Sequence, residues 1–282
     1  MRWRWPGHRH DPGARVTMKP ETRFVAADDG TRIAVECRGP KDAPALLLSN
    51  SLGTTMHMWR PQVDAFAADY RLVRYDGRGQ GLSQSPAGTY SMDRLGRDAL
   101  AVLDSLEIDR AHFCGLSMGG MVGQWLAHRA PERLLRLVLA NTSACMAPPS
   151  AWQQRLEGVL ANGMAPLAEA SLGRWFTPGF LASRPDEAEW IRQMLLANDP
   201  QGYAGCCAAI RDMDQRPTAV LNRVPTLVIA GEADAATTVT DATFLVDAAA
   251  DARLATLPAA HLSNVECPEL FARAVLTHIA AS

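Results

Sequence analysis

The 282-residue sequence has no apolar run close to the roughly 18–20 residues that a membrane-spanning helix needs. It has no excess of one charge either, because the formal net charge is −2. A balanced charge gives no electrostatic reason to expect binding to nucleic acid or to an anionic membrane. The chain also has no internal repeat and no low-complexity tract. With 48% hydrophobic residues, it has enough apolar material for a large core in one or two domains.

Cysteine is sparse, and no pair of cysteines has the spacing of a zinc site. The adjacent pair lies in a helix-like stretch, where a disulfide is not expected. Scattered cysteines of this kind predict free thiols and a reducing, cytoplasmic location. The six are Cys37, Cys114, Cys145, Cys206, Cys207 and Cys267.

Residues 1–18 differ from the rest of the chain. They are rich in arginine, tryptophan, proline and glycine, and they lack the apolar core of a secretory signal. His8 and His10 have metal-binding chemistry, but a disordered N-terminal extension is the favoured interpretation, and no metal site is expected. Met18 begins a more ordinary sequence and is an alternative translation start.

Short strand-like runs alternate with helix-like runs from residue 22 onward. This rhythm predicts an α/β fold, in which a mostly parallel sheet carries helices on both faces. The predicted strands are residues 23–27, 33–37, 45–49, 70–75, 113–116, 134–140, 226–230 and 253–257; the predicted helices are residues 58–68, 92–106, 118–129 and 240–249 and a last one from Pro268.

Residues 148–216 interrupt the alternation, since they show helical periodicity and little strand character. Pro148-Pro149 and Arg216-Pro217 bracket the segment. We expect an inserted helical cap here, with residues 19–147 and 217–282 forming the core. The alternative is a set of additional surface helices.

Gly115-Leu116-Ser117-Met118-Gly119 is the most informative motif. It reads G-x-S-x-G between a strand-like and a helix-like run, which is the context of a nucleophile elbow. Such a turn holds its serine in a strained conformation and leaves no room for side chains on either side. Ser117 is therefore the predicted nucleophile.

A serine needs a base, and the base needs an acid to orient it. His261 follows the last predicted strand, at the carboxyl edge of the sheet where the elbow also lies. It is the best placed of the seven histidines. Asp234 is the preferred acid, because it follows the strand at 226–230, and Glu232 is its rival. The order Ser, Asp, His is that of an α/β-hydrolase.

Attack on a carbonyl also requires donors for the oxyanion. The backbone N–H of Met118 follows the nucleophile and opens a helix, so it is one candidate. The backbone N–H of Leu52, in the loop after the third strand, is the other.

Several blocks resemble the α/β-hydrolase superfamily over residues 19–282 and, within it, the 3-oxoadipate enol-lactonases. In that family the block at 76–81 usually reads Asp-x-Arg-Gly-His-Gly, and Gln80 replaces its histidine here. We interpret this block as a structural turn, so the replacement does not change the expected function. The blocks are Asn50-Ser51-Leu52-Gly53-Thr54, Arg74-Tyr75-Asp76-Gly77-Arg78-Gly79-Gln80-Gly81, Cys114-Gly115-Leu116-Ser117-Met118-Gly119-Gly120, Asn141-Thr142-Ser143, Arg174-Trp175-Phe176 and His261-Leu262-Ser263-Asn264.

The resemblance implies an eight-stranded α/β-hydrolase fold with Ser117, Asp234 and His261 as catalytic triad. It implies a serine hydrolase that opens 3-oxoadipate enol-lactone to 3-oxoadipate in aromatic catabolism, through an acyl-enzyme and without metal or organic cofactor. A small lactone or ester is the expected partner, and a homo-oligomer stays open. Since the substrate carries a carboxylate, Arg174 is a candidate to pair it, and Trp152 and Trp175 are candidate pocket walls. A solvated arginine and two core tryptophans are the alternatives.

Other activities fit the same frame. These are a carboxylesterase, a carbon–carbon bond hydrolase and a cofactor-free perhydrolase. A hydrolase-like protein that only binds a ligand would be expected to have a broken triad, and all three residue types are present here.

Overall fold

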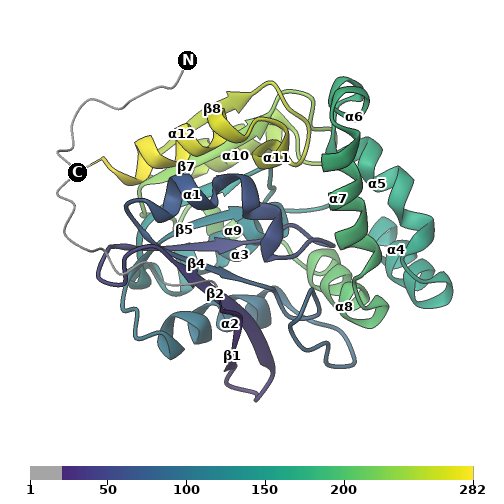
Figure 1. The fold of residues 1–282 in the computed structure, drawn as a ribbon, viewed down its shortest axis with the longest axis horizontal. Helices are drawn as coiled ribbons and strands as arrows, with labels where there is room; N and C mark the ends of the chain where they lie inside the picture. The colour runs from purple at the N-terminus through teal and green to yellow at the C-terminus, as the bar shows by residue number, and fades with distance from the viewer. Residues whose placement is uncertain (1–20, 282) are drawn as a thin grey trace.

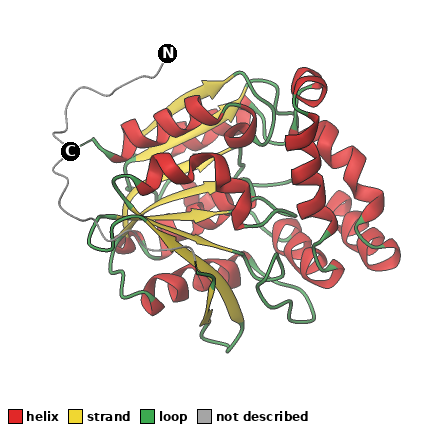
Figure 2. Cartoon of the chain, in the orientation of Figure 1, coloured by secondary structure: helices red, strands yellow, loops and turns green. Residues whose placement is uncertain are grey.

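The computed structural model describes residues 21–281 (Figure 1). The predicted N-terminal extension at 1–18, including His8 and His10, lies outside the described residues. An eight-stranded sheet runs through the centre of the molecule, and helices flank it (Figure 2).

The sheet has the strand order β1-β2-β4-β3-β5-β6-β7-β8. The six strands from β3 to β8 are parallel, and β1 and β2 are antiparallel to their neighbours. The central strands β3 and β5 are buried along their whole length, because helices cover both faces. The strands are β1 (Arg23–Ala26), β2 (Arg32–Arg38), β3 (Ala45–Ser49), β4 (Arg71–Tyr75), β5 (Ala111–Leu116), β6 (Leu134–Ala140), β7 (Thr226–Gly231) and β8 (Ala252–Leu257).

The direction of winding reverses between β3 and β5. From β3 the chain moves to β4 on one side, whereas from β5 it moves to β6 on the other. Because strand crossovers are right-handed, the two directions place helices on opposite faces. The loops that follow β3 and β5 therefore diverge, and ligands of open α/β sheets bind in the crevice that such a divergence opens. The predicted elbow and oxyanion loop lie at this position.

The core helices follow from this winding. Helices α2 and α3 pack together, and α1 packs against α12. These helices are α1 (Val63–Ala67), α2 (Met92–Ser105), α3 (Met118–Arg129), α10 (Val239–Ala248) and α12 (Pro268–Ile279), with the short helices α9 (Arg216–Ala219), α11 (Ser263–Glu266) and η2 (Pro131–Arg133, a 3₁₀ helix) between core elements.

One local prediction needs correction, and one short helix is additional. The single helix predicted at 58–68 is wrong: a 3₁₀ helix, η1 (Met56–Gln62), precedes α1. Pro61 lies inside η1 and has no N–H to donate, so a continuous α-helix cannot form there. The short helix α11 just after His261 was not expected, because four residues are too few to show periodicity.

The chain between β6 and β7 is helical from Pro149 to Arg211, as its periodicity predicted. These helices gather at one side of the molecule, to the right in Figure 1. An isolated bridge between Cys145 and Asp214 brings the two ends of the segment together. The helices are α4 (Pro149–Asn162), η3 (Ala165–Leu167), α5 (Ala168–Trp175), α6 (Pro178–Ser183), α7 (Pro185–Leu196) and α8 (Pro200–Arg211).

Candidate active site

Ser117 lies in the turn between β5 and α3, and its backbone is strained. Its φ of 58° and ψ of −116° lie in a region that residues other than glycine rarely adopt. A Cβ at position 115 would lie 2.1 Å from the carbonyl oxygen of Gly119. A Cβ at position 119 would lie 2.2 Å from the carbonyl oxygen of Ser49. The two glycines of the motif are therefore required by close backbone approach.

The hydroxyl of Ser117 forms one end of a hydrogen-bonded chain of three side chains. His261 Nε2 lies 2.9 Å from Ser117 Oγ, and His261 Nδ1 lies 2.8 Å from Asp234 Oδ2. All three residues are buried. An ionised carboxylate only accepts hydrogen bonds, so it assigns the imidazole proton to Nδ1 and leaves the Nε2 lone pair facing the hydroxyl. In that tautomer the imidazole can take the serine proton during attack on a carbonyl.

The carboxylate of Asp234 accepts five hydrogen bonds. Its Oδ1 accepts from the backbone N–H groups of Ala236 and Thr237 at 2.8 and 3.1 Å. Its Oδ2 accepts from His261, from Thr237 Oγ1 at 2.7 Å and from Asn141 Nδ2 at 3.0 Å. Burial by itself would raise the pKa of Asp234, but His261 and these donors outweigh burial and lower the pKa to about 2. The group is therefore held as a carboxylate.

Glu232, the rival acid, points elsewhere. It is exposed, and its side chain makes no hydrogen bond to the other residues of the described chain. Its backbone N–H pairs with Leu257 at the end of β8. Of the two acids, only Asp234 is in contact with His261.

Two side chains that sequence reasoning had not selected hold this arrangement in place. Asn141, with a φ of 45°, donates to Asp234 and to the carbonyl of Ala260. The hydroxyl of Thr142 donates to the carbonyl of Ser117 at 2.8 Å. Both belong to the block Asn141-Thr142-Ser143 at the carboxyl end of β6, a position that marks the crevice. The position of this block at the carboxyl end of a central strand is the sequence signal that could have identified Asn141 and Thr142.

The backbone N–H groups of Leu52 and Met118 are the two donors that the sequence suggested for an oxyanion. Leu52 lines the same cavity as Ser117, and Met118 is the first residue of α3. Within residues 21–281, neither N–H has a protein acceptor. The N–H of Gly119 donates to the carbonyl of Asn50 at 3.0 Å, which ties the loop after β3 to the start of α3. The separation of the two free donors is thereby fixed.

Ser117 and His261 open onto a cavity of about 330 Å³. Trp152, Arg174 and Trp175, the three residues that the sequence suggested for the substrate, all line it. Trp175 is buried and Trp152 is half-buried. The remaining lining residues are Ser51, Leu52, Met121, Met146, Ala151, Arg155, Tyr203, Ile210, Ala236 and Thr237.

The cavity contains two arginines without a carboxylate partner in the described chain. The guanidinium of Arg155 lies 5.2 Å from the ring centre of Trp152. Arg174 makes only a long contact of 3.4 Å to the hydroxyl of Ser171. Burial and the nearby Arg155 lower the pKa of Arg174, because both disfavour the charged form of its guanidinium. An anion bound beside the two guanidinium groups would act in the opposite direction. Sequence reasoning did not select Arg155, which, unlike Arg174, lies in none of the blocks that carry the family resemblance.

The described residues do not group three or more histidine, cysteine or acidic side chains in a way that could hold a metal ion. None of the helices in that part of the chain is long and apolar enough to cross a membrane.

Comparison with known proteins places this geometry in a family. A family model described as alpha/beta hydrolase fold matches residues 44–268. The chain is 45% identical over 237 residues to 3-oxoadipate enol-lactonase 2 of Acinetobacter baylyi, covering 84% of this chain and 89% of that protein.

Solved structures agree with this result. A hydrolase from Pseudomonas aeruginosa is 48% identical, with a TM-score of 0.90 over 92% of this chain and 98% of the other. An enol-lactonase from Burkholderia xenovorans is 40% identical, with a TM-score of 0.90 over 92% of this chain and all of the other. The predicted resemblance and fold class are confirmed, and the chain belongs to the alpha/beta hydrolase fold family.

Proposed function

We propose that the protein is a 3-oxoadipate enol-lactonase, a serine hydrolase that opens the enol-lactone to 3-oxoadipate in aromatic catabolism. Relatives that carry this name support the proposal. The observation that carries it is the combination found in one cavity. A hydrogen-bonded Ser117–His261–Asp234 chain opens onto a space that also holds two arginines, neither of which has a carboxylate partner among residues 21–281. That combination suits an ester carbonyl in an anionic substrate.

In the proposed acylation step, Ser117 Oγ attacks the lactone carbonyl while His261 Nε2 takes the hydroxyl proton. The N–H groups of Leu52 and Met118 stabilise the oxyanion that forms. The ring C–O bond then breaks, and the enolate leaves, takes the proton back from His261 and becomes the ketone, so His261 is neutral again. Since the leaving group stays attached to the acyl chain, the whole substrate remains in the cavity as an ester of Ser117.

In the proposed deacylation step, His261 removes a proton from water, and the hydroxide attacks the acyl carbonyl. Collapse of this second intermediate releases the new carboxylate and returns the proton to Ser117. The carboxylate of Asp234 keeps the imidazolium stable in both steps and stays ionised.

We propose that the helices from α4 to α8 act as a cap over the site, with residues 19–147 and 217–282 as the catalytic core. The cap supplies Trp152, Arg155, Arg174 and Trp175 to the cavity, whereas the core supplies the triad. The core treats any carbonyl alike, so substrate choice comes from the cap. We propose that Arg174, together with Arg155, pairs the substrate carboxylate and that the two tryptophans wall the pocket.

Removal of the Arg174 charge tests this assignment. Arg174→Ala should raise KM for the anionic lactone by about 30- to 150-fold, corresponding to roughly 2–3 kcal/mol for a charge-assisted hydrogen bond. Turnover of a neutral ester should barely change. Arg184→Ala is the matched control, because Arg184 lies in the same segment and pairs with Glu187 on the surface. Equal losses on both substrates would mean that Arg174 only holds the cap together.

Kinetics on two matched substrates test the function itself. The purified protein should turn over the carboxymethyl enol-lactone much faster than a neutral aryl ester, and Ser117→Ala should lose about 10⁴–10⁶-fold on both. Efficient ester turnover without lactone opening would identify a carboxylesterase. Activity only on a carbon–carbon substrate or in peracid formation would identify the other two alternatives.

We also propose a cytoplasmic location, with the reducing conditions that suit free thiols. All six cysteines are free, and Cys37, Cys114, Cys206 and Cys207 are buried.

A further inference from the structure

Gln80, which stands where the family usually has histidine, lies behind the oxyanion loop. It comes from the turn after β4, and it is 1% exposed. Its side-chain Nε2 donates to the carbonyl oxygen of Ser51 at 3.0 Å. A carbonyl oxygen only accepts, so this contact fixes which end of the amide faces Ser51. The side chain is thus a specific donor to one peptide group.

That peptide group is the one whose N–H belongs to Leu52. In a trans peptide the C=O and the N–H point in opposite directions. The hydrogen bond holds the Ser51 carbonyl toward Gln80, so the Leu52 N–H points to the opposite side of the peptide group. Leu52 lines the cavity onto which Ser117 and His261 open.

The same carbonyl has two more donors from one residue. The Thr54 backbone N–H reaches it at 3.2 Å and the Thr54 hydroxyl at 2.8 Å. The N–H contact closes a turn in which Gly53 has a φ of 78°. Gln80 is the only donor of the three that comes from outside this turn. The hydrogen bond from Gln80 therefore fixes the turn at residues 51–54 relative to the turn after β4.

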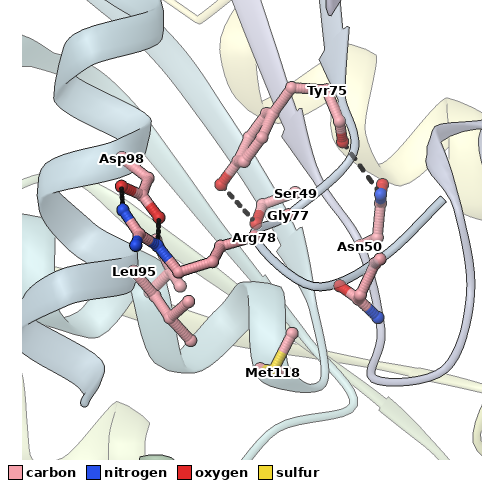
Figure 3. Close-up of a pocket in the computed structure, with 10 residues that line it drawn as sticks. Ser49, Asn50, Tyr75, Gly77, Arg78, Leu95, Asp98 and Met118 are labelled. Carbon is pink, nitrogen blue, oxygen red and sulfur yellow. Dashed lines mark hydrogen bonds and ion pairs between the residues drawn. The ribbon is translucent and has the colours of Figure 1, made fainter. Parts of the chain in front are cut away.

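The surroundings of Gln80 leave it little freedom. It lines a small cavity of about 10 Å³ together with Asn50, Tyr75 and Met118. Figure 3 shows the last three of these residues. The hydroxyl of Tyr75 is hydrogen-bonded to the hydroxyl of Ser49, and the side-chain amide of Asn50 donates to the backbone carbonyl of Tyr75. Met118 lines this cavity, whereas it is not among the residues that line the cavity of Ser117 and His261. Gln80 therefore sits between the two segments that supply the proposed oxyanion donors.

We propose that Gln80 is a positioning residue for oxyanion stabilisation, acting through the Ser51–Leu52 peptide group. This inference rests on the proposed serine-hydrolase mechanism, but it does not depend on which ester is the natural substrate. Loss of the donor should weaken binding of the transition state and leave binding of the ground state unchanged, because the substrate carbonyl carries little charge before attack.

The test replaces Gln80 by methionine, which has similar length and no donor, and by histidine, which retains a ring N–H. On a neutral aryl ester, Gln80→Met should lower kcat by about 10- to 100-fold, less than the roughly 10²–10³-fold cost of deleting an oxyanion donor. KM should stay within about twofold. The inhibition constant of a trifluoromethyl ketone, which forms a tetrahedral adduct with the serine, should rise by the same factor as kcat falls. Gln80→His should restore most of kcat.

A purely structural role predicts another outcome. Gln80→Met would then lower the melting temperature while kcat and inhibitor affinity of the folded enzyme stayed at wild-type values, and that result would overturn the proposal. If Gln80→Met does not fold, Thr54→Val serves instead, since it removes a second donor from the same carbonyl. It should show the same loss of kcat at constant KM. The aryl ester keeps the test separate from the substrate question, because failure to open the enol-lactone would leave these ratios measurable.

Discussion

Replacement of Asp234 by asparagine changes one atom in the centre of the site, and the structure indicates how that atom acts. With the amide nitrogen at the Oδ1 position, it would face the N–H groups of Ala236 and Thr237 at 2.8 and 3.1 Å. The amide NH₂ and the two backbone N–H groups would then face one another as three donors without an acceptor. Each buried backbone N–H left unpaired costs about 1–3 kcal/mol, so this orientation is disfavoured.

With the nitrogen at the Oδ2 position, the neighbours can adapt. The Thr237 hydroxyl can rotate to accept, and His261 can accept at Nδ1 by changing tautomer. Only the amide of Asn141 loses its acceptor there. The change of tautomer puts the imidazole proton on Nε2, which faces Ser117 Oγ at 2.9 Å. The histidine then has no lone pair for the serine proton.

We therefore expect Asp234→Asn to fold normally and to lose about 10⁴-fold in kcat, or about 5.4 kcal/mol of transition-state stabilisation. The measurement is the initial rate on an aryl ester, with thermal unfolding as the check on folding. Glu232→Gln is the matched control, since that side chain is exposed and does not contact His261, and it should retain wild-type activity. An Asp234→Asn protein with a tenth of wild-type turnover, or a large loss in the control, would refute the reasoning.

Three further changes have outcomes that follow from contacts in the fold. Gly119→Ala should abolish ester hydrolysis and lower the melting temperature, because its Cβ would lie 2.2 Å from the carbonyl oxygen of Ser49; wild-type rates would contradict this. Asp98→Asn should destabilise the protein by about 1–3 kcal/mol in urea unfolding, because it removes a buried carboxylate that accepts two hydrogen bonds from Arg78 at 2.8 Å, while Arg78 keeps Asp29 as a second partner; an unchanged free energy of unfolding would contradict this. Burial lowers the pKa of His112 from 6.5 to about 4, so between these values the unfolded chain binds a proton that the native state does not, and stability should fall as the pH falls. His112→Leu should reduce that dependence in a series of melting curves without removing it, because burial also lowers the pKa of His278 to about 4; an unchanged slope would contradict the role of His112.

The sequence by itself determined those features that depend on residues close together along the chain. Alternating periodicity predicted the eight strands and most helices, because a strand or helix is patterned by its own burial. The two glycines around Ser117 marked the elbow, since the steric limits of that turn are local. His261 and Asp234 could be placed at one sheet edge, because parallel strands end on the same side. The proline in η1 shows that even local structure departs from periodicity when a donor is missing.

Only the tertiary structure decided which side chains meet. Asp234 and Glu232 are two residues apart, and the path of the chain after β7 brings one of them to His261 and turns the other to solvent. Gln80, in the family's turn motif, donates to the carbonyl of Ser51, which lies 29 residues away in the sequence. Arg155 and Arg174 lie in the same cavity only because α4 and α5 both contribute to its lining. Such contacts depend on the register and packing of elements distant in sequence, and residue type and local periodicity do not encode them.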